Sequence, residues 1–261
     1  MKSFKGFKPN MTCRGYKYEE GKTYTTPDAE VCITGFHACE YPLDCFEYYP
    51  PAKSVYHKVE QSGEIDRLDL ATDTKVASTE IKVCERLSFK EIAEAAISMR
   101  PDSLYQTRET DAVASMFNGS VVRADGNRRI AATTGRCSIA ISTNDYSYNS
   151  AAVATGMYSV AITESEETVS VVTNTLSMAI AKDAYSVAVA TGGGSAVSVE
   201  HKGSIGVAWG YDCKAKGVLN SWLVLTDEGC DDAKLIKIDG IKYMPDTWYV
   251  LKDGVVKEVN D

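Results

Sequence analysis

A nine-residue repeat fills the middle of the chain and restricts its fold more than any other feature. In the stretch AYSVAVATGGGSAVSVEHKGSIGVAWG (184–210), a serine recurs at Ser186, Ser195 and Ser204, each followed by small and aliphatic residues. The units run from residue 118 to 210 with a three-residue insertion, DYS, at 145–147, and 109–117 and 211–219 read as degraded end copies. A fixed short period sustained over this length predicts a solenoid.

The residue types of the repeat favour β-structure, because Val and Ile are dense, Gly closes many units and helix formers are scarce. The fourth and sixth positions hold larger aliphatics such as Val187 and Val189, and the fifth and seventh hold small residues such as Ala188 and Ala190. Two units per coil predict two facing sheets. We expect the aliphatic residues to fill the interior and the small residues to form a flat outer face. A homodimer or homotrimer would assemble through this face of the solenoid.

The segments on either side of the repeat lack its period. Residues 1–108 predict a small α+β domain of short strands, with a short helix over 41–49 and a second helix opened by the capping box Ser88–Glu91. Residues 220–261 predict a β cap of two hairpins that turn at Asp239-Gly240 and Asp253-Gly254. The predicted fold is therefore mainly β: the N-terminal domain, a nine-residue-repeat solenoid over 109–219, and the hairpin cap.

Composition limits the classes of partner. The 261 residues carry a formal net charge of −8, which excludes an extended nucleic-acid surface because phosphates require Lys and Arg. No apolar run is long enough to span a membrane, and no signal-peptide segment opens the chain, so we expect a cytoplasmic protein with eight reduced cysteines. The spacing of Cys32, His37, Cys39 and Cys45 fits no common zinc site. No metal and no cofactor are predicted.

Two resemblances concern the solenoid and the termini. The segments CRGYKYEEGKTY, GFHACEYPLDCFEYYPP and PDTWYVLKDG resemble a family of unknown function that is associated with phage and prophage proteins. This resemblance implies a viral source and brings no established activity. The SVAIG-like runs resemble the head repeats of trimeric autotransporter adhesins, which supports the solenoid and a trimer. Nine-residue calcium-binding repeats need an Asp that these units lack.

A third resemblance concerns chemistry. The segments GFHACEYPLDCFEYY (35–49), VYHKVEQSGEI (55–65) and STEIKV (78–83) are similar to motifs of ADP-ribosyltransferases of the poly-ADP-ribose-polymerase type. The resemblance implies that Glu80 is the catalytic carboxylate, that Tyr49 or Tyr48 stacks on nicotinamide, and that Arg14 replaces the ribose-binding residue. The His-Gly-Thr motif is missing and the spacing is compressed.

Each of these candidates also has a structural interpretation. Arg14 can be solvated, Tyr49 can pack against a helix, and Glu80 can lie on an exposed strand. His37, a further catalytic candidate, can be hydrogen-bonded within the fold.

Four arginines gather where the repeat begins. Their guanidinium groups suit phosphate binding, and a phosphate ligand could lie between subunits. Alternatively, they cap the first coils and pair with acidic residues of the N-terminal domain. The candidate ligand-binding residues are Arg123, Arg128, Arg129 and Arg136.

Three functions follow as hypotheses. The first is a non-catalytic, phage-encoded oligomer that acts in the host cytoplasm on a host protein or sequesters a nucleotide-type immune signal. The second is a transferase or hydrolase that uses NAD or ADP-ribose, and the third is a structural component of a virion or fibre. The missing export signal, the thiols and the incomplete catalytic set favour the first hypothesis.

Overall fold

The chain forms two compact units, Met1–Met99 and Arg100–Asn260, each with its own hydrophobic core. The computed structural model describes residues 1–67, 73–99, 104–107, 112–125, 128–143 and 150–259. The predicted insertion at 145–147 and the predicted domain boundary between residues 108 and 109 lie outside these described residues. No helix in the described ranges is long and apolar enough to cross a membrane.

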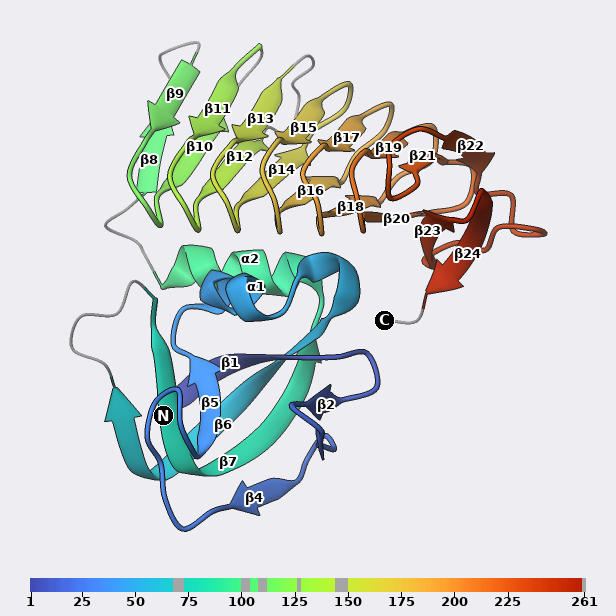
Figure 1. Cartoon of the computed structure of the whole chain (residues 1–261). Coiled ribbons are helices and arrows are strands. Elements are labelled where there is room, and N and C mark those ends of the chain that lie inside the picture. The colour runs from blue at the N-terminus through green and yellow to red at the C-terminus, as the bar shows by residue number, and fades with distance from the viewer. Residues whose placement is uncertain (68–72, 100–103, 108–111, 126–127, 144–149, 260–261) are drawn as a thin grey trace. The chain divides into compact units, whose positions relative to one another are not determined.

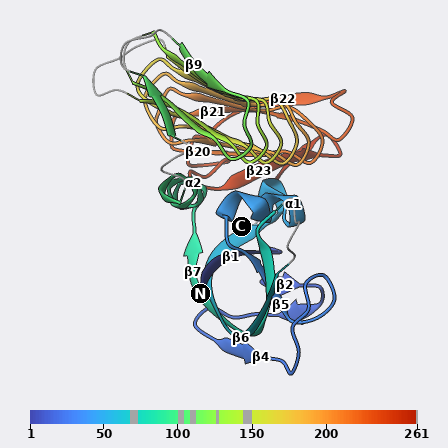
Figure 2. The same ribbon diagram turned by 90° about the vertical axis from the view of Figure 1, so that its left-hand side faces the viewer.

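The first unit is built around a small closed β-barrel (Figure 2). Strand β1 pairs antiparallel with β5 and β6, and β7 pairs with both β5 and β6, which closes the ring. Beyond β5, the same edge of β7 pairs with β4, while β2 and β3 form a short hairpin. The strands are β1 (Lys2–Phe7), β2 (Thr12–Cys13), β3 (Tyr16–Lys17), β4 (Thr23–Thr25), β5 (Phe36–Cys39), β6 (Val55–Arg67) and β7 (Lys75–Leu87).

Helices occur in two places in this unit. The first place holds η1 (Pro42–Asp44), α1 (Cys45–Tyr48) and η2 (Pro51–Lys53), and the second holds α2 (Phe89–Ser98). The Ser88 hydroxyl accepts the Glu91 N–H, and the Glu91 carboxylate accepts the Ser88 N–H at 2.7 Å, so the predicted capping box is confirmed. The helices predicted over 41–49 and after Ser88 are therefore both present.

The second unit is a β-solenoid of about six turns between residues 112 and 225, with two facing parallel sheets (Figure 1). The even-strand sheet contains β8 (Leu104–Thr107), β10 (Val121–Asp125), β12 (Ile139–Thr143), β14 (Val160–Glu164), β16 (Met178–Ala181), β18 (Ala196–Val199) and β20 (Lys214–Gly217). The odd-strand sheet contains β9 (Ala112–Ser115), β11 (Ile130–Thr133), β13 (Ala151–Ala154), β15 (Val169–Val172), β17 (Val187–Ala190), β19 (Ile205–Ala208) and β21 (Trp222–Thr226). Each predicted unit supplies one strand, and two units complete one coil.

The prediction about which face lies inside is wrong. Ala188 and Ala190 are fully buried in the solenoid core, whereas Val187 and Val189 on the same strand are partly exposed. The small residues therefore fill the interior and the aliphatic residues of the odd-strand sheet point outward. The two sheets approach so closely that a methyl group added at Gly206 would lie 3.1 Å from Val197 Cγ1 across the core. Most interior positions therefore hold small side chains, and larger ones such as Val197 and Leu223 pack beside Gly206.

The unit GGSAVSVEH (193–201) departs from the repeat, because valines occupy its fifth and seventh positions, and the core compensates for them. Val197 and Val199 on β18 point inward and are buried, in place of the usual small residues. They face Gly206, where an added Cβ would meet both valines and Leu223. The irregularity is a large residue packed against a glycine.

The recurring serines form ladders along the corners of the coils. The Ser177 hydroxyl accepts the Ser159 N–H at 3.2 Å and donates to the Gly156 carbonyl at 3.4 Å. The same pattern recurs at Ser186 and Ser204, and Cys213 takes a serine position and donates its thiol to a carbonyl. Because the corner backbone groups are buried, each hydroxyl provides partners that water cannot supply. This requirement explains the nine-residue spacing of serine.

Replacement of one ladder serine tests this interpretation. We expect Ser177→Ala to destabilise the protein by about 1–3 kcal/mol, because the Ser159 N–H and the Gly156 carbonyl lose a buried partner. Ser177→Cys should cost less, since the natural Cys213 donates in the same way. Chemical denaturation followed by circular dichroism measures both changes. Equal stability of Ser177→Ala and the wild type would contradict the role assigned to the ladder.

The C-terminal segment covers the last edges of both solenoid sheets. Strand β22 (Ala233–Lys237) pairs antiparallel with β21, and β23 (Trp248–Lys252) pairs antiparallel with β20 and with β24 (Val255–Val259). The hairpin predicted at Asp253-Gly254 is confirmed by the positive φ angles of both residues.

The other predicted hairpin of the cap is wrong. The Asp239 carboxylate accepts three successive backbone N–H groups, from Ile241 to Tyr243, and holds residues 239–243 in a loop. Strand β22 pairs with β21 and not with the segment that follows it.

Candidate functional site

The outer face of the odd-strand sheet is a continuous apolar surface. In each of its seven strands two alternate side chains point away from the core, and their cross-strand register aligns them in two rows. None of these side chains is charged or carries a hydroxyl or amide group. This outer apolar face consists of Ala112, Ala114, Ile130, Ala132, Ala151, Val153, Val169, Val171, Val187, Val189, Ile205, Val207, Trp222 and Val224.

The outer apolar face is exposed and is large enough to be an interaction site. Ile130 is 46% exposed, and Val169, Ile205 and Trp222 are each 38% exposed. Seven parallel strands of four residues span roughly 34 Å by 13 Å, a footprint of about 400 Å². Uninterrupted apolar patches of this size on soluble proteins usually mark interaction sites.

The outer face of the even-strand sheet has a different composition. It also carries aliphatic residues in its middle strands, but Arg123 stands at its beginning and Lys214 and Lys216 stand at its end. Charged groups at both ends limit the length over which this face could pack against a partner without enclosing water. The outer apolar face of the odd-strand sheet carries no charged side chain on its seven parallel strands, and Lys237 of β22 pairs with Trp222 at its end.

His37, one of the catalytic candidates, is held by backbone groups. Its Nδ1 lies 3.2 Å from the Gly35 carbonyl oxygen, and its Nε2 accepts the Cys32 N–H at 2.9 Å. Burial, and next the charge of Lys5, lower the pKa of His37, so the imidazole is neutral near pH 7. Both ring nitrogens therefore serve to fix the loop that precedes β5.

Tyr49 and Arg14 lie at the same end of the barrel. The Tyr49 side chain covers Gly6 of β1, where an added Cβ would come within 2.4 Å of Tyr49 Cβ. Burial, and next a hydrogen bond with Cys13, raise the pKa of Tyr49 far above its usual range. Arg14 is exposed at the β2–β3 turn with φ of 47°, and its charge lowers the pKa values of both His37 and Tyr49. The charge of Arg14 therefore acts on both groups, opposing the rise in the pKa of Tyr49.

Glu80 has different partners. Its carboxylate accepts the Ser62 hydroxyl at 2.6 Å from the neighbouring strand β6. Its strand neighbour Ile81 is buried in the barrel core opposite Gln61, so Glu80 and Ser62 share the outer face. Among the described residues, no hydrogen bond or ion pair joins Glu80 to the other three candidates.

The four arginines are distributed over the first coils. Arg123 points outward from β10 and its Nε donates to Asp125 at 2.9 Å. Arg128 and Arg129 occupy the corner before β11, and the Arg129 N–H donates to Ser150 at 3.2 Å. Arg136 lies at the opposite corner, with its guanidinium 4.8 Å from the Tyr158 ring centroid. Strand β11 therefore separates Arg136 from Arg128 and Arg129 by roughly 13 Å or more.

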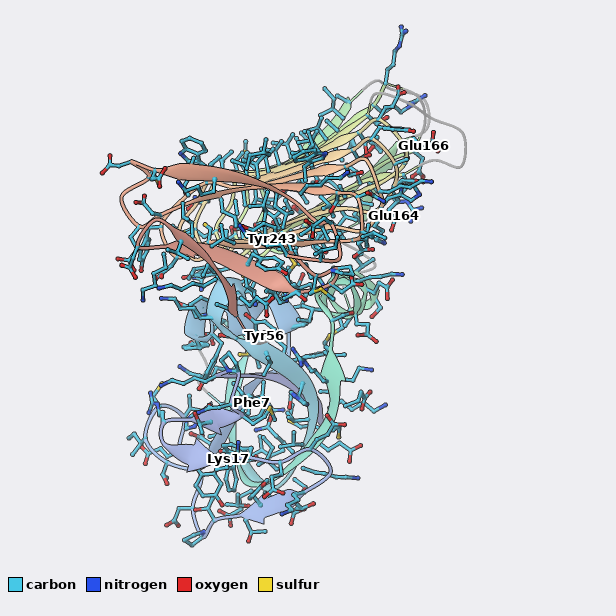
Figure 3. The ribbon with its side chains drawn as sticks, turned by 90° about the vertical axis from the view of Figure 1, so that its right-hand side faces the viewer. Phe7, Lys17, Tyr56, Glu164, Glu166 and Tyr243 are labelled. Atoms are coloured by element: carbon cyan, nitrogen blue, oxygen red, sulfur yellow. The ribbon has the colours of Figure 1, made fainter. Side chains whose placement is uncertain are left out.

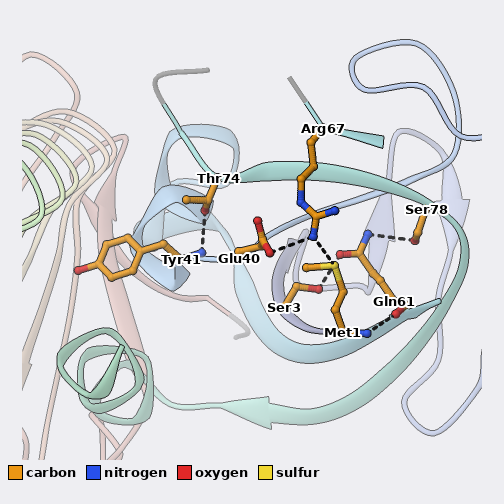
Figure 4. A network of polar contacts seen from close by, with 8 residues as sticks. All are labelled: Met1, Ser3, Glu40, Tyr41, Gln61, Arg67, Thr74 and Ser78. Carbon is orange, nitrogen blue, oxygen red and sulfur yellow. Dashed lines mark hydrogen bonds and ion pairs between the residues drawn. The ribbon is translucent and has the colours of Figure 1, made fainter. Parts of the chain in front are cut away.

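Gln61 links the strands of the barrel and was not recognised in the sequence (Figure 4). Its side chain is fully buried, accepts the Ser3 hydroxyl at 2.6 Å, and donates to the Phe36 carbonyl at 2.9 Å and to Ser78 at 3.0 Å. One amide thus joins β6 to β1, β5 and β7. Its sequence context, EQSGE, is that of an exposed polar strand, and nothing in it indicates burial.

Lys5 was also missed, because it lies among other lysines in the N-terminal KSFKGFK. Alternation along β1 places it on the same face as Phe7, whose side chain is buried in the barrel core, and only 4% of Lys5 is exposed. This placement distinguishes Lys5 from its exposed neighbour Lys2. A buried lysine in an aromatic environment is the type of residue that sequence composition cannot reveal.

The fold and these surfaces define a two-unit β-protein, a small closed barrel joined to a two-sheet β-solenoid. Residues 1–95, which include the whole barrel, match a family described as a domain of unknown function, DUF7666. No curated protein and no solved structure matches the chain.

Proposed function

We propose that this protein is a non-catalytic binding protein that works as a homo-oligomer, assembled through the outer apolar face of the odd-strand sheet. The observation that carries the proposal is the uniform apolar character of that face, with Ile130 46% exposed. Two such faces, related by a twofold axis, would stack as two sheets about 10 Å apart. Each copy would bury the apolar side chains that the isolated chain exposes to water.

The chemistry of the face favours a second copy of the chain over a different partner. A surface whose one polar side-chain group is the Trp222 indole N–H has little with which to select a different protein, whereas an identical flat face is complementary to it. The footprint of about 400 Å² is half of the roughly 800 Å² that each partner of a standard interface buries. The exposed Leu235 of β22, which pairs with Val224, extends the same surface.

The side-chain contacts of the barrel favour binding over catalysis. A transferase of the ADP-ribosyl type would need Glu80 and Tyr49 at one reacting centre. Glu80 instead bonds Ser62, and both ring nitrogens of His37 contact backbone groups. Complete inertness toward NAD is the expected result, and NAD turnover that is lost in Glu80→Gln would favour the transferase.

The biological setting belongs to the same proposal. The N-terminal motifs support a phage-encoded protein that acts in the host cytoplasm, where it would bind a host protein or a nucleotide-type immune signal. Recovery of the protein from the soluble lysate of infected cells is expected. Its recovery in purified particles would favour a structural role in the virion.

The assembly is tested by charge placed on the outer apolar face. Val171→Glu combined with Val189→Glu puts two carboxylates on adjacent odd strands, where burial against a second copy would cost several kcal/mol. We expect this variant to sediment as a monomer in analytical ultracentrifugation at concentrations where the wild type is oligomeric.

Thr175→Glu is the matched control, because it adds a carboxylate at an exposed corner position outside the face. This control should keep the wild-type sedimentation coefficient. An unchanged oligomer in the double variant, with circular dichroism that reports a folded chain, would exclude this face as the interface.

A further inference from the structure

The barrel contains a buried cation, Lys5, that has no anionic partner within the described part of the chain. Lys5 is 4% exposed, and its ammonium group makes one hydrogen bond, to the His37 carbonyl at 2.5 Å. Among the described residues, no carboxylate forms an ion pair with Lys5. An ammonium group can donate three hydrogen bonds, and burial without a counter-charge is costly. One of these three donors has a hydrogen-bond partner among the residues that the structure describes.

Aromatic rings surround this ammonium group. Its Nζ lies 5.5 Å from the Phe7 ring centroid and 5.7 Å from that of Tyr18, within the range of cation–π attraction. These rings compensate part of the desolvation cost but accept no strong hydrogen bond. They also exclude water, so an anion beside Nζ would be attracted more strongly than in solvent.

The aromatic cluster continues from the buried ammonium group toward solvent. Tyr18 contacts Tyr16 at 4.9 Å between centroids, and Tyr16 also packs against Tyr24 and Phe36. Tyr16 is 49% exposed, although its ring belongs to this cluster. An exposed ring supported by other rings is a stacking platform for a planar group. Figure 3 shows Phe7 and Lys17 in this part of the barrel.

A second cation stands at the same end of the barrel. Arg14 occupies the β2–β3 turn between Cys13 and Tyr16 and makes no ion pair among the described residues. Arg14 is two residues from Tyr16, the exposed ring of the aromatic cluster, and its charge, after burial and the charge of Lys5, also lowers the pKa of His37.

We propose that this end of the barrel binds an oxyanion carried on a planar aromatic group, with Lys5 and Arg14 on the oxyanion and Tyr16 against the ring. The inference rests on the proposed role as a binding protein but not on the assembly. Arg14 offers a planar fork to a phosphate or carboxylate, and Lys5 supplies a point charge from within the barrel. The four arginines of the solenoid take no part.

Isothermal titration calorimetry on the full chain tests the site with three probes: AMP, inorganic phosphate and adenosine. We expect AMP to bind at one site per chain, phosphate to bind the same site more weakly, and adenosine not to bind. Equal affinities for AMP and phosphate would also support an oxyanion at Lys5, with the free ion as the ligand. Binding of adenosine alone, or of no probe at millimolar concentration, would overturn the proposal.

Single substitutions show which side chains contribute to AMP binding. Lys5→Met keeps the length and apolar contacts of the side chain and should weaken AMP binding at least about tenfold, which is about 1.4 kcal/mol. Lys17→Met, an exposed lysine on β3 of the hairpin that carries Arg14, is the matched control and should bind as the wild type does. Arg14→Gln changes only an exposed turn residue and should also weaken binding, which keeps the test valid if Lys5→Met misfolds.

The oligomeric mass of each variant, measured on the same samples, separates the two proposals. Loss of AMP binding with an unchanged oligomer is the expected result for Lys5→Met. AMP binding that is equally strong in the wild type, Lys5→Met and Arg14→Gln would exclude this site, whatever the oligomeric state.

Discussion

Ala188→Leu is expected to destabilise the solenoid by more than about 3 kcal/mol. Ala188 is fully buried between the two sheets, and its register neighbour Gly206 leaves no room even for a methyl group, which would lie 2.9 Å from Leu223 Cδ2. Three additional carbon atoms must therefore push the sheets apart or force strained rotamers. Chemical denaturation followed by circular dichroism measures the loss.

The adjacent residue provides the matched control. Val187→Leu enlarges a partly exposed side chain of the outer apolar face, one position away on the same strand. It should change the free energy of unfolding by less than about 0.5 kcal/mol. A large effect of Val187→Leu with a small effect of Ala188→Leu would reverse the assignment of inner and outer faces.

Gln61→Leu should be the second most damaging change, with a loss of about 2–4 kcal/mol. The leucine fills a similar volume but leaves the buried hydroxyls of Ser3 and Ser78 and the Phe36 carbonyl without the amide that contacts all three (Figure 4). Each buried polar group that loses its partner costs about 1–3 kcal/mol, although Ser78 keeps a bond to the Glu80 carbonyl. Chemical denaturation measures this change as well.

Ser62→Ala is the control for the barrel. It removes a hydroxyl that bonds only the Glu80 carboxylate on the exposed side of the same strand pair. We expect a change within about 0.5 kcal/mol. A loss at Gln61 no greater than that at Ser62 would show that the buried network contributes little to the barrel.

The period of the repeat was sufficient to predict the solenoid but not which side chains of each strand face its interior. Both alternating sets, Val187 with Val189 and Ala188 with Ala190, are apolar, so patterning could not decide which set lies inside. The decision depends on how closely the two sheets approach, which is a property of the folded coil. The clearest sequence signal was Gly206, which stands opposite Val197 where a uniform interior would place alanine.

The candidate sites were likewise only partly predictable from the sequence. The sequence placed Arg14, His37 and Tyr49 in one domain, and in the structure the charge of Arg14 acts on the other two groups. It could not place Lys5, because alternation on β1 decides its burial and a short lysine-rich strand reads as solvated. The first Asp-Gly pair of the cap failed as a hairpin signal, since the Asp239 side chain satisfies the next three backbone N–H groups itself.

Native mass spectrometry of the full-length wild-type protein tests the central claim most directly. The account predicts an oligomer whose mass is a whole multiple of the 28.4 kDa subunit, with the dimer expected from two stacked faces. The same spectrum reports any small molecule that the barrel retains. A monomer of 28.4 kDa at every concentration at which the folded protein stays in solution would contradict assembly through the outer apolar face.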